Sequence, residues 1–274
     1  MSILLFIVLV LPALLYLAAW RVSSAPGPAG ERRGGVILLS LGLLAHAVAL
    51  YHEVLGSGWR FGFAPILSAT LWIGLVILWF EGLQVRLQPL RRLVLPVAAV
   101  AAVLPLLFPG ADISAQASLP LFVPHLLVGT LAYGVLALAA LHAILMIATE
   151  RALHGGAAPL PDSAIGRFLE ELPPLLVLER ILFRFITVGF ALLTLTALSG
   201  VLFSEEVFGR PFVADHKSVF SLIAWAVFGV LLIGRRLRGW RGRTALRLTL
   251  AGFGLLLLAY VGSRFVLEVV LGRS

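Results

Sequence analysis

Long apolar runs dominate this sequence and limit what the chain can fold into. Eight such runs, each near the ~20 residues that a helix needs to cross a bilayer, alternate with short charged stretches. Hydrophobic residues make up 61% of the 274 residues and charged residues only 12%, whereas soluble domains have roughly 45–50% and ~25%. The core of a soluble domain of 274 residues cannot bury that excess of hydrophobic residues, so a soluble globular enzyme is excluded.

We therefore predict an all-α fold, a polytopic membrane helical bundle in a single integral membrane domain over residues 1–274. The sequence contains no GxxxxGK[ST] or HExxH motif and no set of Ser, His and Asp residues typical of a hydrolase. This indicates a non-enzymatic protein. The eight transmembrane helices are expected at 2–20, 35–51, 63–83, 93–108, 121–147, 181–203, 218–233 and 248–267.

The basic residues predict the orientation of these helices. Sixteen of the 21 arginine and lysine residues fall in one set of alternating loops, and five fall in the other set. Cytoplasmic loops carry the excess of basic residues, so the arginine-rich loops are expected inside and both termini outside. The net charge of +8 is then explained by loops beside the lipid bilayer, and no nucleic-acid partner is expected.

The six histidines carry the chemistry that the sequence offers. The chain contains no cysteine, which excludes thiolate metal sites. Neutral imidazole is the usual axial ligand of haem iron. His125 and His216 lie where predicted helices meet outer loops, and we expect them to approach each other as haem iron ligands, their only predicted metal role. His46, inside the second span, is a third candidate; a packing residue that hydrogen-bonds a neighbour is the alternative.

The outer loop 204–217 adds polar groups beside His216. Arg210 and Lys217 are candidate partners for the haem propionates, since charged donors bind carboxylates strongly. Asp215 is a candidate to orient His216 or to pair with Lys217. The aromatic residues of this loop are equally typical of an ordinary interfacial belt.

This loop also carries a family resemblance. Residues 208–220 read FGRPFVADHKSVF, which resembles the outer-loop pattern WGxxWxWDxKExW of the cytochrome c assembly (CcsA-type) membrane proteins. Gly, Asp and Lys stay in register, while Phe or Ala replaces each Trp. Residues 124–133, PHLLVGTLAY, resemble the family's histidine followed eight residues later by Tyr-Ala.

A shorter branch, the YpjD/HemX-like inner-membrane proteins, resembles the chain over about 36–271. Five segments carry this resemblance in order: 173–180 (PPLLVLER), 192–200 (LLTLTALSG), 216–225 (HKSVFSLIAW), 239–242 (GWRG) and 258–264 (LAYVGSR). The resemblance implies eight helices, haem binding or haem handling in cytochrome c assembly or its supply, the bacterial cytoplasmic membrane, and other cytochrome c assembly or haem-synthesis proteins as partners.

Two other functions remain open. The link 148–180, which contains a short amphipathic helix predicted from Ser163 to its stop at Pro173, and the arginine patch at 235–247 favour a membrane regulator or scaffold of tetrapyrrole synthesis or of another complex. Topogenic charge with anionic lipid contact is the simpler explanation of the patch. A small-molecule or ion transporter is the third alternative, although the spans lack the buried charge that transporters usually carry.

Overall fold

The computed structural model describes residues 3–24, 29–56, 59–83, 88–154, 164–208, 216–262 and 265. These residues form two compact units, an N-terminal unit (Met1–Ser118 with Arg264–Ser274) and a C-terminal unit (Leu119–Ser263). Eight of the described helices are long and apolar enough to cross a membrane, which confirms the predicted helical membrane fold. The single domain over 1–274 stays a prediction.

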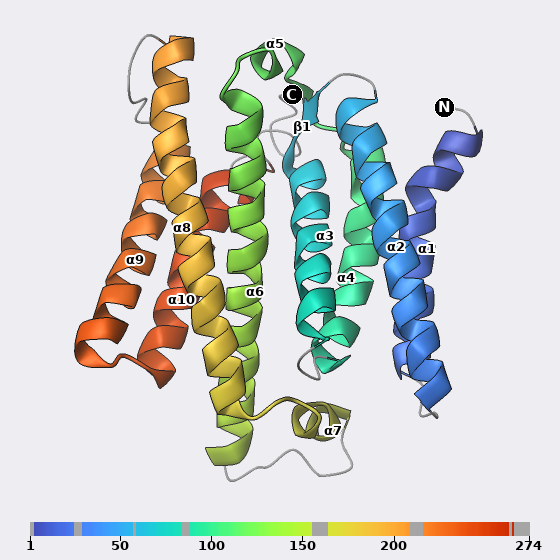
Figure 1. The fold of residues 1–274 in the computed structure, drawn as a ribbon, viewed down its shortest axis with the longest axis vertical. Helices are drawn as coiled ribbons and strands as arrows, with labels where there is room; N and C mark the ends of the chain where they lie inside the picture. The colour runs from blue at the N-terminus through green and yellow to red at the C-terminus, as the bar shows by residue number, and fades with distance from the viewer. Residues whose placement is uncertain are drawn as a thin grey trace. The chain divides into compact units, whose positions relative to one another are not determined.

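The N-terminal unit is a ring of four antiparallel helices (Figure 1). The first helix packs against the second and the fourth, and the third packs against the same two. At one end, the strands β1 (Arg60–Phe61) and β2 (Ala111–Asp112) form an antiparallel pair, followed by the short helix α5 (Ser114–Ala117). The ring consists of α1 (Ile3–Ser24), α2 (Ala29–Leu55), α3 (Phe63–Glu81) and α4 (Gln88–Leu107).

The C-terminal unit repeats this cyclic order with different helices. Its first long helix packs against the second and the fourth, and the third packs against the same two. The fourth helix changes from α to π geometry before it ends (η1, Leu258–Gly262). The short helix α7 (Ala164–Glu170) confirms that the link contains a short helix, and Ser163 lies outside the described residues. The long helices are α6 (Phe122–His154), α8 (Leu175–Phe208), α9 (His216–Arg238) and α10 (Gly242–Leu257).

Small residues let the helices of the C-terminal unit approach closely. A Cβ atom at Gly189 of α8 would lie 2.5 Å from Leu136 Cδ2 of α6, and one at Gly129 of α6 would lie 3.4 Å from Thr196 Cγ2 of α8. Lipid is as apolar as leucine, so helices in a membrane associate through such close packing and through hydrogen bonds. These contacts set an antiparallel register between α6 and α8.

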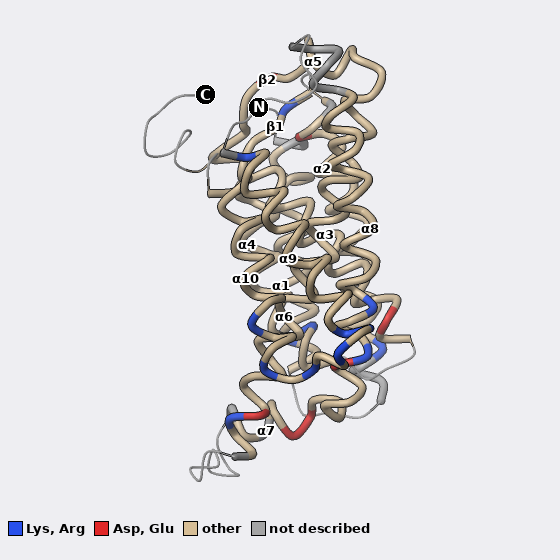
Figure 2. Tube along the Cα trace, turned by 90° about the vertical axis from the view of Figure 1, so that its left-hand side faces the viewer, with Lys and Arg blue, Asp and Glu red and all other residues tan. Residues whose placement is uncertain are grey.

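Charge distinguishes the two ends of each unit (Figure 2). In the C-terminal unit, arginines gather where α6 and α9 end and where α8 and α10 begin. In the N-terminal unit, Arg21, Arg33 and Arg91 lie near the ends joined by the α1–α2 and α3–α4 connections, while Arg60 lies at the other end. We call these the arginine-rich and the arginine-poor end of each unit.

Candidate functional site

His125 of α6 lies at the arginine-poor end of the C-terminal unit and contacts α8. Its Nδ1 is 2.9 Å from the Ser199 hydroxyl, and that hydroxyl donates a hydrogen bond to the Thr196 carbonyl at 3.1 Å. A hydroxyl has a single proton to donate, so in this network the Nδ1–H of His125 donates to Ser199. The tautomer inferred from the network places the imidazole lone pair on Nε2, the ring atom that would bind a metal.

Gly200 shapes the same site. A Cβ atom at this position would lie 3.2 Å from His125 Cε1 and 3.7 Å from Nδ1. The glycine therefore gives the imidazole room to lie against α8 and reach Ser199. Sequence reasoning missed both Ser199 and Gly200, although they end the segment LLTLTALSG that carries part of the family resemblance.

His216 is the first residue of α9, and its side chain lies outside the described part of the chain. The register of α9 is set by a hydrogen bond of 2.9 Å from Trp225 Nε1 to the Thr194 hydroxyl of α8. Counting outward from this contact, His216 lies about 6 Å, or one helical turn, beyond the level of Ser199. Both predicted ligands therefore belong to the arginine-poor end of this unit. The approach of their rings stays a prediction.

A second polar cluster joins the other helices at this end. Lys217 Nζ of α9 lies 5.7 Å from the ring centroid of Tyr260 in the π-helical turn. Tyr260 packs edge-on against Tyr133 of α6 with 6.4 Å between ring centroids, and the Tyr133 hydroxyl donates to the Leu256 carbonyl of α10. π-Helical turns often mark functional sites. Lys217 was predicted from sequence; the two tyrosines were not, and Arg210 and Asp215 lie outside the described residues.

His46 has a different environment, in the interior of the N-terminal unit. It is fully buried, and its Nδ1 lies 3.0 Å from the Tyr16 hydroxyl of α1 while its Nε2 lies 2.8 Å from the Ser68 hydroxyl of α3. Both ring nitrogens are thus engaged in hydrogen bonds that join three helices. These contacts fit the packing alternative for His46.

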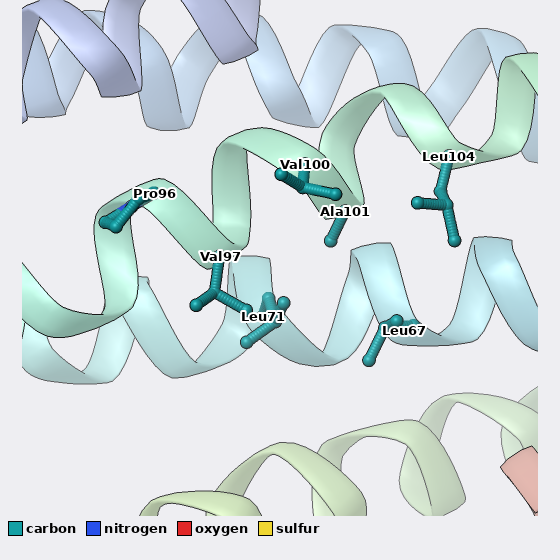
Figure 3. Close-up of a pocket in the computed structure, with 7 residues that line it drawn as sticks. All are labelled: Leu67, Leu71, Pro96, Val97, Val100, Ala101 and Leu104. Atoms are coloured by element: carbon teal, nitrogen blue, oxygen red, sulfur yellow. The ribbon is translucent and has the colours of Figure 1, made fainter.

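A hollow of about 380 Å³ lies on the N-terminal unit between α3 and α4 (Figure 3). Its walls are entirely apolar, from Leu67 and Leu71 on α3 to Pro96, Val100 and Leu104 on α4. Such a surface suits an acyl chain and offers no ligand to a metal. Within the part of the chain that the structure describes, no group of three or more His, Asp or Glu side chains is placed to hold a metal ion.

The helices, their charged ends and the buried polar contacts define a multi-pass helical membrane protein. The family model described as "Cytochrome C assembly protein" matches residues 35–271, and the chain belongs to this family. It is 30% identical over 268 residues to the "Inner membrane protein YpjD" of Escherichia coli (strain K12), covering 94% of this chain and 98% of that protein. It is 34% identical over 109 residues to the "Cytochrome c biogenesis protein CcsA" of Thermosynechococcus vestitus, covering 40% of this chain and 34% of that one.

Proposed function

We propose that this protein binds haem at the arginine-poor end of its C-terminal unit and handles it in cytochrome c assembly or its supply, without catalysing a reaction. The observation that carries the proposal is the hydrogen-bonded series from His125 through Ser199 to the Thr196 carbonyl. Histidines that bind metals almost always donate their second ring N–H to such a partner, which fixes the tautomer and makes the ligand nitrogen more basic.

The residues proposed for this end would match haem in charge as well as in ligand type. His125 would provide one imidazole ligand to the haem iron, and His216 is the candidate for the second. Lys217, which lies over the Tyr260 ring, and Arg210 would form ion pairs with the haem propionates. Asp215 would orient His216 or pair with Lys217. When bound, the haem iron would supply a redox centre, while the chain's own residues would bind and orient the group.

Location and charge support a place in haem delivery. The YpjD relative is named for the inner membrane and the CcsA relative for cytochrome c biogenesis. The positive-inside rule places the arginine-poor ends outside, so haem bound near His125 would be presented at the outer surface of the cytoplasmic membrane. Other cytochrome c assembly or haem-synthesis proteins are the proposed partners.

The Ser199→Ala variant tests the observation behind this proposal. Removing the hydroxyl leaves His125 and its hydrogen bond with the Thr196 backbone in place but takes away the Ser199 partner of its Nδ1. We expect haem affinity to fall roughly 10- to 100-fold, the usual effect of losing such a partner, as measured by titrating haem into the apoprotein and following the Soret band.

Thr187→Val is the matched control, because Thr187 is also on α8 and its hydroxyl bonds only its own helix, at the Phe183 carbonyl. It should keep wild-type affinity. Unchanged affinity in Ser199→Ala, or an equal loss in both variants, would contradict the proposed role of His125.

A further inference from the structure

The end of α9 combines an exposed apolar stripe with two exposed arginines. Val230, Ile233 and Leu237 are 51%, 60% and 77% exposed, and their spacing of three and four residues places them on one helix face. At about 100° per residue, Arg236 and Arg238 project roughly a quarter turn to either side of that face. The stripe therefore ends, at the arginine-rich end, between the helix positions of two arginines.

The neighbouring arginines are already used in contacts within the C-terminal unit. Arg235 Nη1 lies 3.0 Å from Glu179 Oε1 and its guanidinium carbon 3.3 Å from the Phe183 ring centroid, both on α8. Arg241 Nε shares the same carboxylate oxygen at 3.2 Å, and Arg243 Nε lies 3.3 Å from Glu150 on α6. Among the described residues, Arg236 and Arg238 have no acidic partner.

The turn after α9 fixes the end of the helix that carries these two arginines. Gly239 has φ +66°, and its amide donates to the Arg235 carbonyl at 3.1 Å, which is a left-handed helix cap that glycine favours. The Trp240 ring packs over Gly234 so closely that a Cβ atom there would overlap it. The helix end is therefore a fixed support for the arginines and not a fraying terminus.

We propose that this surface binds an anionic phospholipid, with its acyl chain along Val230, Ile233 and Leu237 and its phosphate between Arg236 and Arg238. Guanidinium groups form strong paired hydrogen bonds with phosphate, and basic groups on the cytoplasmic side attract anionic headgroups. An acidic protein partner could also pair with the positive charge of these two arginines. The adjoining apolar stripe, which continues the membrane-facing surface of α9, favours the lipid.

Native mass spectrometry of the full chain in detergent tests this, with dioleoylphosphatidylglycerol or dioleoylphosphatidylcholine added. The wild-type chain should retain phosphatidylglycerol in preference to phosphatidylcholine. Arg236→Gln/Arg238→Gln should weaken phosphatidylglycerol binding by about 25-fold, since each arginine contributes about a factor of five. Arg236→Lys/Arg238→Lys keeps the charge but not the paired donors, and its affinity should be intermediate.

Arg21→Gln/Arg33→Gln is the matched control, because it removes the same charge from exposed positions at the arginine-rich end of the N-terminal unit. This pair should retain wild-type lipid binding. The proposal is overturned if the control loses as much lipid as the α9 pair, since the attraction would then come from bulk charge. It is also overturned if the wild-type chain does not discriminate between the two lipids, and an acidic protein would then be the better candidate for this surface.

Discussion

Replacing His125 with alanine is expected to remove most of the haem from the purified protein. The substitution deletes the one described imidazole at the arginine-poor end of the C-terminal unit whose Nδ1–H is bonded to a hydroxyl on a facing helix. Folding should be preserved, since His125 is only half-buried. The measurement is the Soret absorbance and the haem content per chain, beside wild-type protein purified in parallel.

His52→Ala is the matched control for this variant. His52 is an exposed histidine at the end of α2, at the arginine-poor end of the N-terminal unit, where it contacts Tyr51. It should keep the wild-type spectrum. Added imidazole should restore part of the Soret band to His125→Ala by occupying the vacated ligand position. A wild-type spectrum in His125→Ala would remove this histidine from the set of ligands.

Gly189→Ala is expected to destabilise the C-terminal unit strongly for so small a change. The new methyl carbon would lie 2.5 Å from Leu136 Cδ2 and 2.6 Å from Cγ, and the Leu136 side chain is fully buried. Overpacking of this kind costs about 1–3 kcal/mol. The apparent midpoint of thermal unfolding in detergent should fall accordingly.

Gly254→Ala provides the comparison, because a Cβ atom at that position of α10 meets nothing within 4 Å. Its midpoint should be unchanged or slightly higher, since alanine is the better helix former. Gly189→Ala should cost less stability in a chain that already carries Leu136→Ala, because the clashing side chain is then gone. A double-mutant cycle measures this difference. Equal midpoints for the two glycine variants would show that close α6–α8 packing is not what holds this pair.

The number and approximate place of the spans could be predicted because lipid imposes a simple rule on apolar length. The ends of the helices could not. The fifth and sixth spans were expected to end at 147 and 203, but α6 continues to His154 and α8 to Phe208. Apolar runs mark the hydrocarbon core alone, and a helix already formed continues into water at little cost. The π-helical turn at Leu258–Gly262 likewise has no hydropathy signal.

The candidate site was predictable only where one residue type carries the chemistry. Imidazole is conspicuous in a sequence without cysteine, so His125 could be singled out. Ser199 and Gly200 could not, because more than seventy residues separate them from His125 in the sequence. Only the register between α6 and α8 brings them to its side chain. Tyr133 and Tyr260 were missed for the same reason. His46 shows the converse, since its environment of two hydroxyl partners is visible only once three helices are assembled.

The visible absorption spectrum of the wild-type chain, purified after expression with ample haem, tests haem binding most directly. We expect a Soret band whose intensity, compared with protein concentration, corresponds to about one haem per chain, as one pair of axial imidazoles would hold. A colourless protein under these conditions would contradict the account, and a membrane regulator or scaffold would then be the better description of this chain.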